Sequence, residues 1–307
     1  MSHPVPRSLL SRRPDTHKGD YGHVLVVGGS IGLTGAPALC AVAALRSGAG
    51  LVSLGVPESV YFIVASKLTE VMVHPLPETA QGSLGAGAVP VLRSLIRKSD
   101  VIALGPGASQ QPATQHAVQK LVASVDLPIV LDADGVSAFA GRNRAKLRKS
   151  KGPVVITPHP GEMARLLEIS VDSIQRHRTQ TAVKVAKELR VIVVLKGHRT
   201  VVASPSGRSY VNRTGNPGMA TAGMGDVLTG VIAALIGQGL DPFTAAQAGV
   251  YLHGLAGDVA ARRVGQVSLI AGDLLEALPA AFRRVARQKS LGFPLPLREE
   301  GIIGEKP

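Results

Sequence analysis

Residues 23–54 read HVLVVGGSIGLTGAPALCAVAALRSGAGLVSL. An apolar, β-branched run at 23–27 leads into a glycine-rich stretch, a helical pattern at 37–47 and a second apolar run at 51–54. Continuous apolar runs are typical of parallel strands that are covered on both faces, whereas half-exposed strands alternate apolar and polar residues. The stretch therefore predicts a strand–helix–strand unit of a parallel sheet.

The same alternation continues along the chain. Further strands are expected at 71–74, 101–104, 129–131, 154–157, 191–195 and 200–203. Helices are expected at 58–67, 86–97, 112–124, 161–167 and 173–189, followed by 226–237, 242–262 and 269–287. This order predicts an α/β fold with a mostly parallel central sheet and helices on both faces.

Composition sets the class of protein. The 307 residues are 45% hydrophobic and 18% charged, which allows a large core and excludes wholesale disorder. We expect a single domain over 1–307, with flexible arms at about 1–17 and 290–307. No apolar run is long enough to span a membrane, and the N-terminus lacks the apolar core of a signal peptide, so we expect a soluble, cytoplasmic protein. The only cysteine, Cys40, excludes an internal disulfide and a multi-cysteine metal site.

The charge balance is strongly basic, with 34 Lys and Arg against 21 Asp and Glu, for a net charge of +13. Basic patches lie at 142–151 and 283–289. A basic surface, a site for polyanionic small molecules and a nucleic-acid interface are all compatible with this charge. Aromatic residues make up 3% of the chain and Trp is absent, which disfavours stacking of single-stranded nucleic acid. Nucleic-acid binding is therefore the less favoured alternative.

Glycine-rich turns follow five of the expected strands. They are GGSIGLTGA (28–36), GPGAS (105–109), DADG (132–135), TPHPGE (157–162) and KGHRT (196–200). Ligands of open α/β sheets bind beyond the carboxyl ends of the strands, so these turns predict a polar cleft along one sheet edge. Neither a Walker G-x-x-x-x-G-K-[ST] motif nor a Rossmann G-x-G-x-x-G motif is present, which disfavours P-loop enzymes and Rossmann dehydrogenases.

The strongest chemical signal is NPGMATAGMGDVLTG at 216–230. Gly218, Gly223 and Gly225 precede an apolar helix that starts near Asp226, so backbone N–H groups and the helix dipole would form an anion hole. Asp226 is either a plain helix cap or the general base of a phosphoryl transfer, and the three glycines favour the base.

Other residues in these turns leave alternatives open. Asp132 and Asp134 suit either Mg²⁺ binding through water or capping of a short helix. Lys196 would reach a nucleotide phosphate or lie in a surface turn, and His159 on its own is a weak signal.

Together these motifs, with VPESV (56–60), occur in a characteristic order over about residues 18–260. The chain thereby resembles the NAD(P)H-hydrate dehydratase family. The resemblance implies a ribokinase-like fold and a lyase that repairs the S epimer of NADH or NADPH hydrate. It implies ADP or ATP as co-substrate with Mg²⁺ as cofactor: phosphorylation of the ring hydroxyl, then elimination of phosphate. The nearest alternative is a kinase of the same fold that acts on a vitamin precursor or a sugar.

The resemblance also implies roles for particular residues. The adenine nucleotide would contact the KGHRT turn and the glycine-rich run, at Lys196, Gly197, His198, Arg199, Thr200, Gly223 and Gly225. The hydrate would contact Ala36, Gly107 and His159, together with Asp226 as base. No protein metal ligand is assigned.

The resemblance further implies a homo-oligomer, a tetramer. Many members carry an epimerase domain ahead of this one, and about 17 residues precede the match here, so we expect the epimerase activity in another polypeptide. Met224 stands where Ser, Thr or Gln is commoner in the family, which predicts slightly weaker nucleotide binding.

Overall fold

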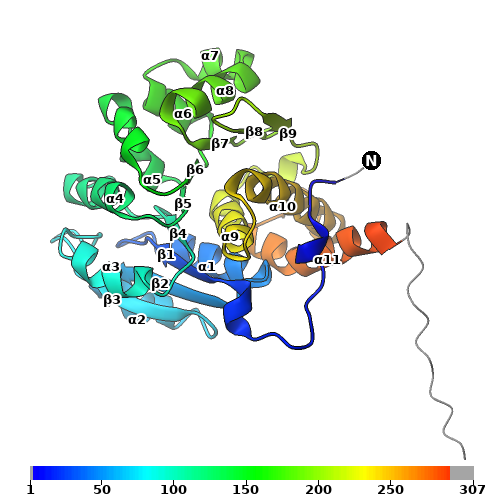
Figure 1. Ribbon diagram of the computed structural model, residues 1–307, viewed down its shortest axis with the longest axis horizontal. Coiled ribbons are helices and arrows are strands. Elements are labelled where there is room, and N and C mark those ends of the chain that lie inside the picture. The colour runs from blue at the N-terminus through cyan, green and yellow to red at the C-terminus, as the bar shows by residue number, and fades with distance from the viewer. Residues whose placement is uncertain (1–2, 291–307) are drawn as a thin grey trace, which may run out of the picture.

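A computed structural model of the chain describes residues 3–290, and its core is one nine-stranded sheet (Figure 1). The strands are β1 (His23–Val27), β2 (Leu51–Pro57), β3 (Met72–Leu76), β4 (Val101–Leu104), β5 (Ile129–Leu131), β6 (Val154–Ile156), β7 (Ile192–Leu195), β8 (Val201–Ala203) and β9 (Ser209–Val211). Their spatial order is β3-β2-β1-β4-β5-β6-β7-β8-β9. The pairs from β3 to β7 are parallel, and β8 and β9 extend the sheet in antiparallel pairing.

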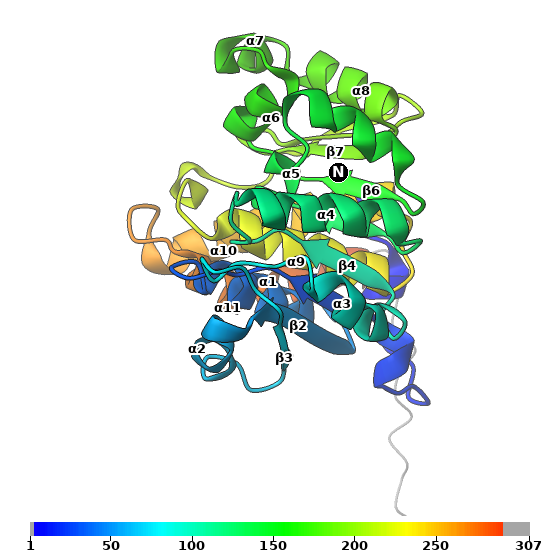
Figure 2. The same cartoon turned by 90° about the vertical axis from the view of Figure 1, so that its left-hand side faces the viewer.

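Helices cover both faces of the sheet. They are α1 (Gly35–Arg46), α2 (Tyr61–Ala65), α3 (Ala88–Ile96), α4 (Pro112–Ser124), α5 (Asp134–Ser137), α6 (Pro160–Leu167), α7 (Val171–Arg176), α8 (Arg178–Leu189), α9 (Met224–Gly237), α10 (Pro242–Val264) and α11 (Ala271–Ser290). In Figure 1, α3 and α4 lie to the left of the central strands, and α1, α9, α10 and α11 lie to the right. Figure 2 views the molecule from the side that α3 and α4 cover. The predicted α/β architecture is confirmed.

Strand β1 explains why the apolar runs are continuous. Val24 and Val26 belong to the core on the side of α1 and α9, whereas Leu25 and Val27 belong to the core on the side of α3 and α4. All four side chains are at most 1% exposed. A strand at the centre of a two-sided sheet needs apolar residues at every position, because neither face meets water.

Most elements lie where the sequence predicts them, and three regions differ. The helix expected at 58–67 is a 3-10 turn (Glu58–Val60) followed by the short helix α2. The helix expected at 173–189 is two helices, α7 and α8, separated at His177, whose backbone is not helical (φ −132°, ψ 40°). Strand β9 was not expected, because its edge position leaves Ser209 and Val211 exposed and removes the apolar pattern.

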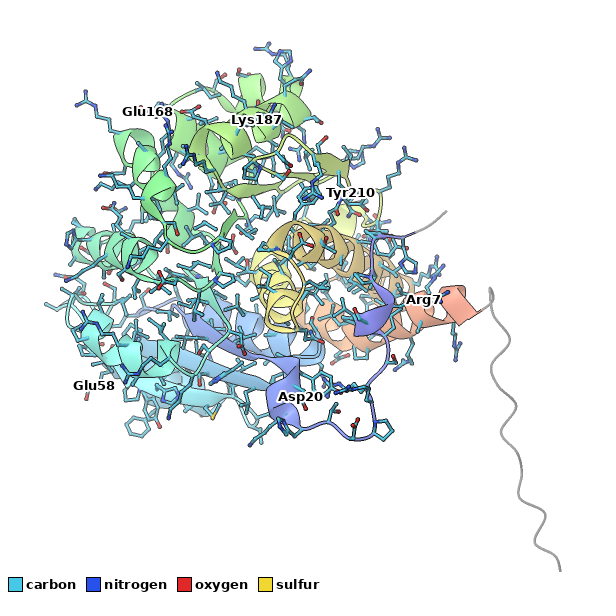
Figure 3. The ribbon with its side chains drawn as sticks, viewed as in Figure 1. Arg7, Asp20, Glu58, Glu168, Lys187 and Tyr210 are labelled. Carbon is cyan, nitrogen blue, oxygen red and sulfur yellow. The ribbon has the colours of Figure 1, made fainter. Side chains whose placement is uncertain are left out.

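The segment before Lys18, expected to be a loose arm, contacts the core in part. Val5 is 1% exposed, and Leu9 and Leu10 pack against the core on the α11 side. Figure 3 shows Arg7 of this segment beside α11. Apart from the end of α11, the arm expected at 290–307 lies outside the described residues. No helix within residues 3–290 is long and apolar enough to cross a membrane.

Candidate active site

The carboxyl ends of β1 and β4–β7 meet at one edge of the sheet. The chain runs outward from β1 through β2 to β3, and then outward on the other side from β4 to β7, so the order reverses between β1 and β4. A crevice at such a switch point is the usual ligand site of an open α/β sheet. Here the loops that follow β1 and β4 are hydrogen-bonded to each other: the Gly29 N–H donates to the Pro106 carbonyl at 2.9 Å. The Ser30 hydroxyl donates to the Gly107 carbonyl, also at 2.9 Å.

The structure brings together two of the residues assigned to the hydrate. Gly107 has φ +63°, and a Cβ there would lie 3.4 Å from the Ala36 Cβ and 2.7 Å from the Leu33 carbonyl oxygen. Its neighbour Gly105 instead closes against the next loop, where a Cβ would come within 2.2 Å of the Asp132 carbonyl oxygen. Gly107 is therefore the glycine whose bare backbone faces the start of α1, and its contact with the hydrate stays a prediction.

Charged side chains follow β5, β6 and β7. Asp132 is 1% exposed, and its Oδ1 accepts hydrogen bonds from the Thr157 hydroxyl at 2.7 Å and the Lys196 ammonium at 2.6 Å. Lys196 Nζ also lies 3.8 Å from Glu162 Oε2. Burial alone would raise the pKa of Asp132, but the ammonium and the two hydrogen bonds hold that pKa below its usual value. Asp132 is thus an ionised carboxylate locked to Lys196.

Asp226 occupies the first turn of α9, as expected, and its electrostatic surroundings differ from those of Asp132. Gly223, which precedes the helix, has φ +86° and lets the chain enter the helix sharply. Burial, and then the charge of Asp132, raise the pKa of Asp226 to about 7, and Lys196 offsets part of this rise. A carboxylate with a pKa near 7 is suited to accept a proton at physiological pH.

Lys196 lies directly against the glycine-rich turn. A Cβ at Gly225 would be 3.0 Å from its Nζ, so the ammonium, the bare backbone and the start of α9 share one small space. The Lys196 side chain, 17% exposed, therefore lies beside the start of α9, and its contact with a nucleotide phosphate stays a prediction. The other residues of KGHRT lie further out: Gly197, His198 and Arg199 are exposed, and the Thr200 hydroxyl donates to the Gly197 carbonyl at 3.0 Å.

His159 has a structural role at the start of α6, and its contact with the hydrate stays a prediction. It is the N-cap of α6: its Nδ1 accepts the Gly161 N–H at 3.0 Å and the Glu162 N–H at 3.3 Å. Glu162 completes the capping box by accepting the His159 N–H at 2.8 Å. Because Nδ1 is an acceptor, its ring proton is on Nε2, which lies 3.4 Å from Glu162 Oε1. Half of the His159 side chain remains exposed for a ligand.

The two aspartates of DADG have different roles. Asp134 binds the loop after β4, since its carboxylate accepts the Ser109 N–H at 2.8 Å and the Gln110 amide at 3.1 Å. Neither aspartate caps α5 with its side chain, because the N-cap is Ala133. In the described part of the chain, no three His, Cys, Asp or Glu side chains are grouped to hold a metal ion.

Two positioning residues escaped the sequence analysis. The Arg178 guanidinium donates to the carbonyls of Leu195 (2.9 Å) and Lys196 (3.2 Å) and so fixes the start of the KGHRT turn. Asp258 on α10 accepts the Gly215 N–H at 3.0 Å and the Asn216 amide at 3.1 Å, which anchors the glycine-rich run from behind. Neither residue lies in a motif, and only the folded chain brings them to the site.

Comparison with known proteins identifies the family. The family model for NAD(P)H-hydrate dehydratase matches residues 24–280, a segment that contains all the residues of the site. The chain belongs to the NAD(P)H-hydrate dehydratase family. It is 53% identical over 283 residues to the bifunctional NAD(P)H-hydrate repair enzyme Nnr of Moorella thermoacetica, covering 92% of this chain and 53% of that one. It spans about half the length of the bifunctional relatives that it matches.

Shorter members of the NAD(P)H-hydrate dehydratase family match over nearly their whole length. The ADP-dependent (S)-NAD(P)H-hydrate dehydratase of Neisseria meningitidis is 38% identical over 281 residues, covering 89% of this chain and 88% of that one. The Bacillus subtilis ADP/ATP-dependent enzyme, co-crystallized with ATP/Mg²⁺, superposes with a TM-score of 0.76 at 32% identity, covering 90% of this chain and 94% of that one. The fold is ribokinase-like, as predicted.

Proposed function

We propose that this chain dehydrates the S epimer of NADH or NADPH hydrate, with ADP or ATP as phosphoryl donor. It is then a lyase of nucleotide repair that releases NADH or NADPH, phosphate, and AMP or ADP. Family membership and the relatives' names support the proposal. The observation that carries it furthest is the half-buried Asp226, with a pKa of about 7, at the start of α9 beside Lys196.

Asp226 acts as the general base. Its carboxylate takes the proton of the ring hydroxyl, and the hydroxyl oxygen attacks the terminal phosphorus of the nucleotide, whose bond to the leaving nucleotide oxygen breaks. The lone pair of the ring nitrogen then expels phosphate with the carbon–oxygen bonding pair, and proton loss from the ring restores the double bond. Phosphorylation is needed because phosphate leaves far more readily than hydroxide.

Lys196 and the glycine-rich turn hold the transferred phosphoryl group. Backbone N–H groups at Gly223 and Gly225 have no Cβ beside them, so phosphate oxygens approach closely and meet the positive end of the helix dipole. Lys196 is held in place by Asp132 before the nucleotide arrives, so less ordering is needed on binding. Ala36, Gly107 and the exposed ring of His159 contact the hydrate across the switch point.

The residues present fit Mg²⁺ that is carried mainly by nucleotide phosphates. A protein cage of three ligands is absent from residues 3–290, and Mg²⁺ often binds through one or two carboxylates plus phosphate oxygens. Asp132 would hold it, because its Oδ2 points toward the Gly225 turn while Oδ1 serves Lys196. When bound, Mg²⁺ neutralises charge on the phosphoryl group.

A coupled absorbance assay tests this function. NADH hydrate is supplied with Mg²⁺ and with ADP, ATP or neither, and recovery of the near-ultraviolet absorbance of NADH is followed. We expect recovery only with a nucleotide, and the effective nucleotide identifies the donor. Folded protein that binds nucleotide and yields no NADH would contradict the proposal and favour the kinase alternative, whose product is a stable phosphate ester.

Two further properties stay with this proposal. We propose a homo-tetramer in the cytoplasm. Exposed apolar side chains around α2, β3 and the loop after β1 support an interface between copies; they are Ile31, Leu33, Phe62, Ile63 and Met72. Light scattering during size-exclusion chromatography measures the assembly, and a monomer at micromolar concentration would contradict it.

A further inference from the structure

A second concave site lies on the opposite side of the molecule from the catalytic edge. It is a hollow of about 280 Å³ between the N-terminal segment, the C-terminal ends of α1 and α9, and α11. Gly22, just before β1, packs against Gly237 at the end of α9, which places this hollow near the amino end of the central strand. None of its lining residues belongs to the catalytic site.

The lining is rich in positive charge. Three of its lining residues are arginines, Arg12, Arg46 and Arg283, and the hollow has no acidic lining residue among those the structure describes. Arg46 and Arg283 form no ion pair within residues 3–290. The C-terminal ends of α1 and α9 supply roughly half a negative charge each, which leaves a net positive field.

One of the three arginines is already fixed in position. The Arg12 guanidinium donates to the Gly48 carbonyl at 2.8 Å and lies over the Tyr21 ring at 3.9 Å from its centroid. It therefore loses little conformational freedom when a ligand binds. Arg46 and Arg283 come from separate helices, so the fold rather than a local basic run brings the three together.

Hydroxyl groups complete the donor set. Ser8 and Ser11 line the hollow, and so does Ser47, which is 2% exposed and whose Oγ has no hydrogen-bond partner. Buried polar atoms in folded proteins nearly always have a partner, so the unpartnered Ser47 hydroxyl in this arginine-lined hollow points to an acceptor that a ligand would supply. Pro279 and Phe282 add an apolar wall.

We propose that this hollow binds a small phosphate-bearing molecule. Guanidinium forks and hydroxyl donors match the oxygen atoms of a phosphate group, and no carboxylate that would repel it lines the hollow within residues 3–290. A hollow of this volume is near the lower limit of small-molecule sites, whereas a nucleic acid needs an extended basic stripe. The site goes beyond the proposed dehydratase function and does not depend on it.

Calorimetric titration of the full chain with inorganic phosphate and with AMP tests the proposal at physiological salt. The variants are Arg46→Gln and Arg283→Gln, with Arg284→Gln as matched control: Arg284 is also exposed, follows Arg283 on α11 and does not line the hollow. We expect each lining variant to weaken one class of phosphate sites at least about fivefold, and the control to leave it unchanged. Far-UV circular dichroism confirms folding.

The comparison among variants separates this site from the catalytic one. Phosphate or AMP held at the start of α9 contributes equally to all three variants, so only their difference reports on the hollow. Tighter binding of AMP than of phosphate would identify a mononucleotide seated on Phe282, and equal binding would identify free phosphate. Equal weakening by all three variants, or no weakening by any, would overturn the proposal and leave a merely basic surface.

Discussion

The two halves of the candidate site differ in character. The half formed by the loops after β1 and β4, at the switch point, consists of backbone and small residues such as Ala36 and Gly107. The other half, beyond β5, consists of carboxylates and an ammonium that are mostly buried, among them Asp132 and Lys196. The first half is a closely packed wall with little charge, and the second half carries charged side chains that ion pairs hold in place. Shape suits recognition of a large dinucleotide ring system, and fixed charge suits proton and phosphoryl transfer.

The sharpest test of the charged half is Asp226→Asn. We expect turnover to fall by about 10²-fold or more, because an amide accepts no proton and a general base typically contributes that much. Nucleotide affinity, measured by calorimetry, should stay within about threefold, since backbone N–H groups and Lys196 bind the phosphates. Turnover within tenfold of the unmodified enzyme would remove Asp226 from the role of base.

Lys196→Met tests whether charge in this half also stabilises the fold. The change leaves Asp132 buried without its ammonium, which we expect to lower the free energy of unfolding by about 3 kcal/mol. Urea denaturation measures it, with Lys184→Met, an exposed lysine of α8, as control. Adding Asp132→Asn to Lys196→Met should recover part of the loss. A double variant no more stable than the single one would show that the pair does not act as a unit.

The pKa of Asp226 predicts a pH dependence. Because burial raises this pKa to about 7, the ionised base is lost as pH falls below that value, and kcat/KM should drop about tenfold per pH unit. The stability trend has the opposite sign. A carboxyl whose folded pKa is raised above its unfolded value stabilises the fold at low pH, and this contribution is lost as pH rises through about 7.

Both trends are measured on the same preparation, by turnover and by urea denaturation between pH 5 and pH 9. Asp226→Asn should lack the stability trend because it carries no titrating group. A kcat/KM that is flat across pH 7 would contradict the assignment of this carboxyl as the base.

The smallest expected effect belongs to the uncharged half. Gly107→Ala places a methyl group 2.7 Å from the Leu33 carbonyl oxygen, so we expect the KM for the hydrate to rise about tenfold with nucleotide affinity unchanged. Gly32→Ala is the matched control, because Gly32 also has a positive φ (+82°) and nothing lies within 4 Å of its would-be Cβ. Equal effects of the two substitutions would mean that backbone strain, and not shape at the switch point, is responsible.

The two halves also differ in how well the sequence predicts them. The positions of glycines predict the uncharged half and the start of α9, because a positive φ or a close backbone approach favours glycine at those positions. The strand-end turns also predicted that Asp132 and Lys196 lie at one sheet edge, and the motif at 216–230 predicted Asp226 at the start of a helix. Their division of labour was not predictable, since it depends on which carboxylate Lys196 contacts. Arg178 and Asp258 follow the same rule: they act through contacts with backbone groups far away in the chain.

The bounds of strands and helices were predictable where both faces of the sheet are covered, and less so in the helices further from its centre. The bounds of β1, β4, β5 and α4 follow directly from apolar runs and from Pro112 at a helix start. No proline or glycine marks the break between α7 and α8 at His177, so the sequence pattern predicted one continuous helix.

The central position of β1 has a consequence for the growing chain. This strand is made first, yet its neighbour β4 and its cover α9 are made much later, so Val24 and Val26 stay without their final partners until 227–236 has left the ribosome. Contacts between such distant segments form slowly and expose apolar surface meanwhile. A ribosome paused before α9 would therefore present a sheet whose face on this side is covered by α1 alone, and at that stage the nascent chain exposes apolar surface that chaperones bind.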